Sequence, residues 1–368
     1  MPEDTENSAD LKYLNALQKI PGVGPRRTKI LLAYFETGEN IWKADLGSLS
    51  ASKVGEKLAE RIFLERSGIN PEEEWERLER ENIQVLTLNN PDYPKLLAEI
   101  PNPPFLLYIR GAFDFNRQPA IAIVGSRKYT AYGAQAARGF ARDLATAGIT
   151  VISGLALGID AFAHRGALEA GEKTVAVLGN SLDDQSIYPR ENYNLSREII
   201  ASGALVSEYP VATSAGPLTF PARNRIVAGL TRGTLVVEAG EKSGALITAG
   251  MALEYNREVF AVPGSIFSAQ SLGTNGLIKA GAKLVTGIAD ILEELNLGEG
   301  RLEEKKVPKN PTSIEEEILL KILTTEPVHI DNLAKLAKLQ TATVSSTLSM
   351  MEIKGWVKNI GGQNYILL

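Results

Sequence analysis

The stretch from residue 120 to residue 160 constrains the fold of this chain more than any other part of the sequence. It begins with a continuous apolar run at 120–124, which is typical of a parallel strand buried on both faces. A helical pattern follows from about residue 130 to residue 147, with apolar positions at i, i+3, i+4 and i+7. A second, β-branched strand is predicted at 149–152. The resulting βαβ unit places its two loops at the carboxyl ends of parallel strands, where open α/β sheets bind ligands.

The first of these loops carries a Gly-Ser-Arg sequence instead of a dinucleotide fingerprint. The glycines after the first strand are Gly125 and Gly133, so the G-x-G-x-x-G spacing is absent. The loop offers the Ser126 hydroxyl and the cations Arg127 and Lys128 just before a helix begins, which suits a phosphate. A plain tight turn with a surface arginine explains the same residues equally well.

Composition excludes several classes of protein. The chain has 368 residues, of which 44% are hydrophobic, so two or three ordinary globular domains are expected. It contains no cysteine and only His164 and His329, which argues against disulfides, zinc sites and a cysteine nucleophile. Neither a signal peptide nor a membrane span is predicted, and we expect a cytoplasmic protein. Because the net charge is −5, any nucleic acid must be bound by a local cluster of cations.

Strands and helices alternate along the middle of the chain, which predicts an α/β fold with a Rossmann-like, doubly wound parallel sheet. Two earlier strands, at 83–88 and 105–109, are assigned to the same sheet. The segment after the sheet is charged and bears prolines, as expected of a linker. The predicted organisation is a helical domain at 1–82, a Rossmann-like domain at 83–298, a linker at 299–312 and a winged helix at 313–368.

The helical domain is predicted to contain a helix-hairpin-helix of the SAM-like kind, after a disordered tail at 1–9. The hairpin has the sequence IPGVGP at 20–25 and is followed by Arg26, Arg27 and Lys29. Its free backbone N–H groups could bind a phosphate. The alternative is that the hairpin only packs a small helical domain.

The last segment is predicted to be a winged helix, with three helices and then a hairpin over a Gly-Gly turn. Its third helix is expected to bury Val344, Leu348 and Met351 and to expose Ser345, Ser346 and Ser349. From residue 313 to 368 there are six acidic and five basic residues, a poor balance for binding phosphates. Contact with DNA and contact with protein therefore both stay open.

No coherent catalytic set emerges from the sequence. A Walker A loop fails because Glu241 stands where a glycine must precede the lysine. Asp160 and His164 are four residues apart, and we interpret them as a structural pair on one helix face. Glu238 ends a strand, but neither a nucleophile nor a metal partner accompanies it.

What the sequence does bring together is a set of cations, small residues and aromatic rings in loops at one edge of the sheet. Cations suit phosphates, glycines allow close backbone approach and aromatic rings stack on bases, which together predict a groove for single-stranded DNA. A small nucleotide pocket is the alternative. The predicted DNA-binding residues are Gly125, Ser126, Arg127, Ser153, Gly154, Tyr188, Arg190, Phe220, Arg223, Asn224, Arg225, Lys242, Ser243 and Gly244.

Six ordered motifs resemble the DprA/Smf family of DNA-processing proteins. They are GSR at 125–127, SGLALGID at 153–160, TVAVLGNSLDDQSIYPREN at 174–192, FPARNRIVAGL at 220–230, VVEAGEKSGALITA at 236–249 and FAVPG at 260–264. The family pattern has a glycine where this chain has Ser181. A left-handed backbone there would strain a serine.

The resemblance implies a non-enzymatic, dimeric protein of natural transformation that binds and protects incoming single-stranded DNA and helps to load the RecA recombinase. It implies neither a metal nor a nucleotide cofactor. A rival from another class is a Rossmann-like phosphoribohydrolase that cleaves nucleoside monophosphates, but the P-G-G-x-G-T loop of such enzymes is absent here. A transcription factor built on the winged helix is a third possibility, which the acidic balance of that segment disfavours.

Overall fold

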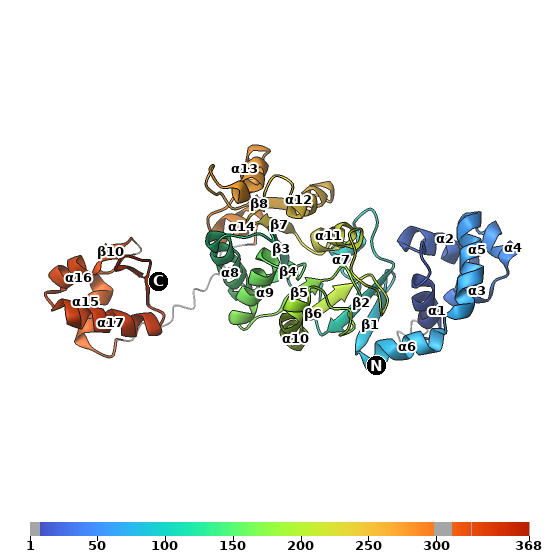
Figure 1. Cartoon of the computed structure of the whole chain (residues 1–368), viewed down its shortest axis with the longest axis horizontal. Helices are drawn as coiled ribbons and strands as arrows, with labels where there is room; N and C mark the ends of the chain where they lie inside the picture. Colours follow the sequence, from blue (N-terminus) through green and yellow to red (C-terminus); the bar gives the residue numbers. More distant parts are fainter. Residues whose placement is uncertain (1–7, 298–310, 325, 368) are drawn as a thin grey trace. The chain divides into compact units, whose positions relative to one another are not determined.

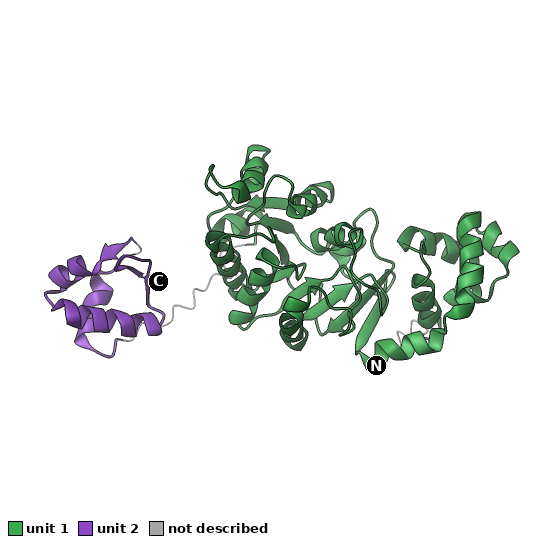
Figure 2. Cartoon of the chain, in the orientation of Figure 1, with its two compact units in different colours: residues 1–302 green, residues 303–368 purple. Residues whose placement is uncertain are grey.

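The computed structural model describes residues 8–297, 311–324 and 326–367. These residues belong to two compact units, one within 1–302 and the other within 303–368 (Figure 2). Of the predicted tail, residues 1–7 lie outside the described residues, whereas Ser8 already begins a helix. The predicted linker lies outside them as far as residue 310.

The first unit opens with a helical head that matches the predicted helix-hairpin-helix. The hairpin between the first two helices holds Gly22 at φ +96°, a backbone conformation that favours glycine. The head is joined to the sheet, because the Tyr108 hydroxyl donates to Asn15 Oδ1 over 2.9 Å. The boundary near residue 82 stays a prediction. The helices are α1 (Ser8–Gln18), α2 (Pro25–Phe35), α3 (Gly38–Lys43), α4 (Leu46–Ala51), α5 (Glu56–Glu65), η1 (Arg66–Gly68) and α6 (Pro71–Arg80).

A nine-stranded sheet forms the centre of the first unit (Figure 1). Its spatial order is β1-β2-β6-β5-β4-β3-β7-β8-β9, and all neighbours from β6 to β9 are parallel. The strands are β1 (Ile83–Thr87), β2 (Leu106–Gly111), β3 (Ala120–Val124), β4 (Thr150–Ser153), β5 (Thr174–Val177), β6 (Ala204–Ser207), β7 (Gly233–Val236), β8 (Glu258–Ala261) and β9 (Lys283–Leu284).

The predicted doubly wound parallel sheet is confirmed, and one end of it is antiparallel, a detail that the prediction did not include. Both β1 and β2 belong to the central sheet, as predicted, but β1 pairs antiparallel with β2, and β2 pairs antiparallel with β6. The sheet is therefore mixed and mostly parallel.

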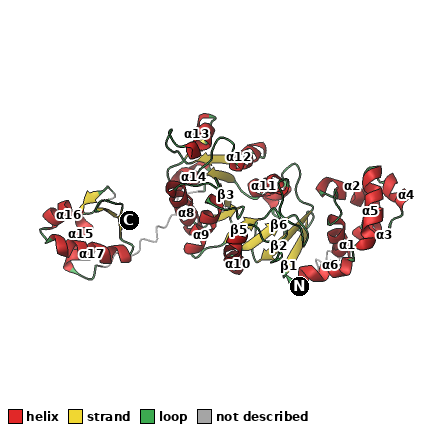
Figure 3. Ribbon diagram, viewed as in Figure 1, coloured by secondary structure: helices red, strands yellow, loops and turns green. Residues whose placement is uncertain are grey.

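Helices cover both faces of the sheet, as a doubly wound fold requires (Figure 3). Alternate residues of β3 show why: Ile121 and Ile123 pack against α8, α9 and α14, whereas Ala122 and Val124 pack against α11 and α12. No helix in the described ranges is long and apolar enough to cross a membrane. The helices that follow β1 in the first unit are α7 (Lys95–Ala98), α8 (Ala131–Thr146), α9 (Ile159–Glu169), η2 (Arg190–Asn192), α10 (Tyr193–Ser202), α11 (Thr219–Gly229), α12 (Gly244–Glu254), η3 (Ala269–Ser271), α13 (Leu272–Lys279) and α14 (Ile288–Glu294).

The second unit is a winged helix, as predicted. It consists of α15 (Ile314–Ile322), β10 (Val328–His329), α16 (Ile330–Ala337), α17 (Thr341–Ile353), β11 (Val357–Asn359) and β12 (Asn364–Leu367), and its strands form one small sheet. In α17 the expected apolar positions, Val344, Leu348 and Met351, are fully buried. The three serines expected on its outer face are exposed.

Candidate nucleic-acid interface

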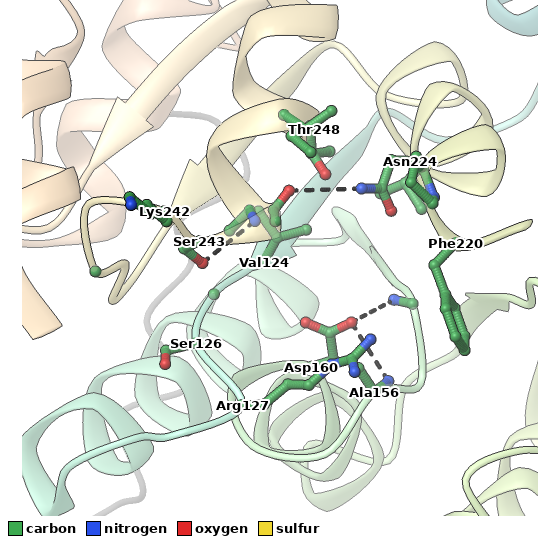
Figure 4. A pocket seen from close by; sticks show the side chains of 18 of the residues that line it. Val124, Ser126, Arg127, Ala156, Asp160, Phe220, Asn224, Lys242, Ser243 and Thr248 are labelled. Atoms are coloured by element: carbon green, nitrogen blue, oxygen red, sulfur yellow. Dashed lines mark hydrogen bonds between the residues drawn. The ribbon is translucent and has the colours of Figure 1, made fainter. Parts of the chain in front are cut away.

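In chain order, β4 to β6 are placed on one side of β3 and β7 to β9 on its other side, so the strand order reverses between β3 and β7. An open cavity of about 600 Å³ lies at this point. Ligands of open α/β sheets bind at such switch points, outside the carboxyl ends of the strands. We call it the edge cavity (Figure 4). The predicted site residues that line it are Gly125, Ser126, Arg127, Gly154, Phe220, Arg223, Asn224, Lys242, Ser243 and Gly244.

The Gly-Ser-Arg loop is held in place by tight packing and by the Ser126 hydroxyl. A side chain at Gly125 would meet Ile159 of α9 at 2.7 Å, so only glycine fits there without a shift. Ser126 Oγ accepts from the backbone N–H of Lys128 over 3.0 Å and donates to Gln270 Oε1 over 2.8 Å. The loop therefore presents the exposed side chains of Arg127 and Lys128 from a fixed backbone.

Arg127 lies beside two aromatic rings at one side of the edge cavity. Its guanidinium carbon is 5.2 Å from the centroid of the Phe220 ring. The rings of Phe220 and Tyr188 are 5.9 Å apart at 42°, and Tyr188 is half exposed. These three side chains also line a small adjoining pocket of about 30 Å³. A cation beside accessible ring faces is the arrangement that a base and its phosphate would meet together.

Arg223 forms the floor of the cavity instead of projecting into solvent. It is only 5% exposed, and its Nη1 donates to the backbone carbonyls of Gly154 and Val177. Buried Asp160 accepts N–H bonds from Gly154 (3.1 Å) and Ala156 (3.4 Å). Burial raises the pKa of Asp160, and the positive charge of Arg223 opposes that rise. Burial also lowers the pKa of Arg223.

The opposite side of the cavity is formed by the loop after β7 and the start of α12. The Ser243 hydroxyl caps α12 by accepting from Ala245 N over 3.3 Å. Asn224 Nδ2 reaches the Gly244 carbonyl at 3.5 Å, so α11 and α12 are joined across the cavity (Figure 4). Lys242 is exposed at the tip of this loop.

Three predicted site residues do not line either pocket. Ser153 is fully buried and donates to the carbonyl of Ile123 over 2.6 Å, so it supports the sheet. Arg225 is 9% exposed and forms an ion pair with Glu208. Arg190 is exposed, but it donates to the Asp184 carbonyl over 2.7 Å and lies over the ring of Tyr193.

One interpretation was wrong, and one possible strain does not arise. Asp160 and His164 do not pair: Asp160 accepts from backbone N–H groups, whereas His164 Nδ1 lies 2.8 Å from Thr174 Oγ1. Ser181 does not have the left-handed backbone that would strain a serine. It is fully buried, and its hydroxyl donates to Asp183 Oδ1 over 2.6 Å.

The carboxylate of Glu238 has a structural role, because both of its oxygens accept hydrogen bonds from Thr130. It is 2% exposed and accepts from the backbone N–H of Thr130 (2.9 Å) and from its hydroxyl (2.5 Å). A side chain at Gly133 would overlap with it, which explains the glycine in the first turn of α8. In the described ranges, no group of three or more acidic or histidine side chains is close enough to hold a metal ion.

Gln270 is among the lining residues that sequence reasoning missed. It lies after β8, 144 residues from Ser126, and no local pattern marks it. Its backbone carbonyl also accepts from Ala239 N over 2.8 Å, so it joins three loops of the cavity. Only a three-dimensional neighbourhood identifies such a residue.

Three family models match the chain in the order of its parts. Residues 84–296 match DNA recombination-mediator protein A, residues 303–363 match the DprA winged helix domain, and residues 14–66 match a SAM-like helix-hairpin-helix tandem. Among curated proteins, Protein Smf of Synechocystis is 37% identical over 97% of this chain and 99% of its own length.

Solved structures give the same result. The X-ray structure of DNA processing protein A from Streptococcus pneumoniae is 35% identical, with a TM-score of 0.67 over 77% of this chain and 97% of that one. A structure of DNA processing protein A from Helicobacter pylori is 32% identical, with a TM-score of 0.53 over 58% of this chain and 96% of that one. That study concerns the binding mode of the Helicobacter protein for single-stranded DNA.

Proposed function

We propose that this chain, which belongs to the family of DNA recombination-mediator protein A, binds single-stranded DNA in the edge cavity. The observation that carries the proposal is the contact of Arg127 with Phe220, beside Tyr188, at the mouth of an open cavity. The Helicobacter pylori relative, whose structure was studied for its single-strand binding mode, supports it.

The chemistry of the cavity favours a single strand over a duplex. Aromatic rings can stack only on bases whose faces are free, and paired bases keep theirs inside the helix. The exposed cations Arg127, Lys128 and Lys242 lie on loops around the same opening and suit the phosphates of one strand. Contacts of these two kinds read no base edges, so we expect little sequence preference.

We further propose that the chain acts without catalysis, protects incoming single-stranded DNA during natural transformation, helps to load the RecA recombinase and works as a homodimer. Membership of the family supports these roles. Two buried carboxylates support the absence of catalysis, because Asp160, which lines the cavity, and Glu238 both accept hydrogen bonds from backbone N–H groups. Release of ribose 5-phosphate from AMP by the purified protein would overturn the non-enzymatic role.

A salt-titrated binding comparison tests the central proposal. Equal lengths of an oligo-dT single strand and a duplex are titrated against the full chain by fluorescence anisotropy. We expect tighter binding of the single strand, with affinity that falls steeply as salt rises, because phosphates release counterions when cations bind them. Equal or stronger binding of the duplex would contradict the proposal.

The Arg127→Ala variant is expected to weaken single-strand binding by about 1–3 kcal/mol, the cost of losing a charge-assisted contact and a cation over a ring. The slope of log affinity against log salt should also fall by about 0.7, the share of one phosphate. Arg142→Ala, which removes an exposed arginine of α8 outside the edge cavity, is the matched control. If both variants bind like the wild type, the site has been assigned to the wrong surface.

A further inference from the structure

The most exposed large apolar side chains of the first unit lie on loops at the edge that holds the cavity. Within residues 10–297, the highest exposed fractions are those of Phe267 (93%), Leu218 (86%) and Ile266 (75%). A single exposed apolar side chain is ordinary, but an adjacent pair beside a ligand site indicates an interaction surface. Phe267 and Ile266 follow β8, next to the loop that carries Lys242.

Strand order determines where Phe267 lies along this edge. The strands run β5-β4-β3-β7-β8, so the loops that follow them carry Tyr188, Gly154, Arg127, Lys242 and Phe267 in that spatial order. Neighbouring strands are about 4.8 Å apart, which places the ends of β5 and β8, from which the first and last of these loops start, about 19 Å apart. An aromatic residue therefore stands at each end of a row in which two of the three middle positions, Arg127 and Lys242, are cations.

The loop with Phe267 is attached to the edge cavity through hydrogen bonds. Ser265 Oγ accepts from Phe267 N over 3.2 Å, and Ser268 Oγ accepts from Gln270 N over 3.3 Å. Gln270 lines the cavity and binds Ser126. Since Phe267 precedes Gln270 by three residues, its Cα lies within roughly 10 Å of a cavity-lining position.

We propose that Phe267 is a second base-stacking position, which extends the single-strand site across the sheet edge from Phe220, past Arg127 and Lys242, to the loop after β8. The proposal rests on the proposed function. A nucleobase is the occupant that fits, because the ring continues a row of cations that already suits the phosphates of one strand. An aromatic ring at the end of that row supplies stacking without adding charge.

The test combines affinity, salt dependence and fluorescence on the full chain. Phe267→Ala is expected to weaken binding of oligo-dT about tenfold, with an unchanged slope of log affinity against log salt, because stacking is lost while every phosphate contact stays. Phe267→Trp should keep wild-type affinity, and the added indole fluorescence should change when oligo-dT binds.

Leu253→Ala is the matched control. Leu253 is 61% exposed, but it lies in the last turn of α12, five residues beyond Thr248, the last residue of that helix that lines the cavity, and so points about 140° away from Thr248 around the helix axis. It should bind as the wild type does. The proposal is overturned if Phe267→Ala also binds like the wild type, or if it changes only the sedimentation of the protein, which would assign the loop to contact between copies.

Failure of this inference and failure of the proposed function give different results. If the wild type does not bind single strands, the proposed function itself fails. If the wild type binds and Arg127→Ala weakens it while Phe267→Ala does not, the strand ends short of the β8 loop and only this inference fails.

Discussion

The Arg223→Met variant is expected to have a free energy of unfolding about 3–5 kcal/mol lower than that of the wild type and to lose most of its affinity for single-stranded DNA. Arg223 is 5% exposed and donates to the carbonyls of Gly154 and Val177 at the ends of β4 and β5. Methionine fills much of the space but leaves these carbonyls without that donor. It also leaves Asp160, itself 6% exposed, without the positive charge of Arg223, and an uncompensated buried charge is costly.

The loss of stability can be measured by urea denaturation of the full chain. The fluorescence of Trp42 and Trp75 reports on the first unit, and binding of oligo-dT is measured separately below the unfolding transition. Asp160→Asn combined with Arg223→Met is the informative control, because it removes the carboxylate that the arginine balances. We expect the double variant to recover part of the lost stability. If it is no more stable than the single variant, the arginine acts through its hydrogen bonds alone.

Much of the fold could be predicted from local patterns. The apolar run at 120–124 and the helical period after it correspond to β3 and α8, because a strand buried on both faces and an amphipathic helix each leave a signature within a few residues. The direction of β1 and β2 could not be predicted in this way. It depends on pairing with β6, nearly a hundred residues further along the chain.

The loops that line the edge cavity could be predicted from the sequence, but the orientation of every side chain on them could not. The loops after the parallel strands lie at one edge of the sheet, as predicted, because the carboxyl ends of parallel strands always meet at the same edge. Arg223, Asn224 and Arg225 are consecutive in α11, so each points about 100° from the last. Only the first two line the cavity, and the third meets Glu208. Which face of a helix reaches the cavity depends on tertiary packing, and no local pattern at these residues records it.

His164 is expected to make the folded chain sensitive to mild acid. Its side chain is fully buried, and burial together with the positive charge of Arg223 lowers the pKa of His164 from 6.5 to about 3. Thr174 Oγ1 donates to the Val151 carbonyl over 2.7 Å, so it accepts the proton of His164 Nδ1. The other nitrogen, Nε2, is buried without a hydrogen-bond partner among the described residues. A second proton there would create an unbalanced charge in the core.

The sign of the effect follows from the two pKa values. Between pH 6.5 and about 3 the unfolded chain binds a proton at His164 that the folded chain refuses, so stability falls as the pH falls through this range. The free energy of unfolding should therefore fall by about 2 kcal/mol between pH 7.5 and 5.0 because of this histidine, at 1.36 kcal/mol per pKa unit.

His164→Asn keeps a donor for Thr174 and cannot be protonated. Urea unfolding of both proteins at the two pH values isolates this residue, because all other titrating groups are shared. The difference in stability between wild type and variant should change by about 2 kcal/mol in favour of the variant at pH 5.0. If the two proteins lose stability in parallel, His164 is already protonated in the folded state or is not buried as described.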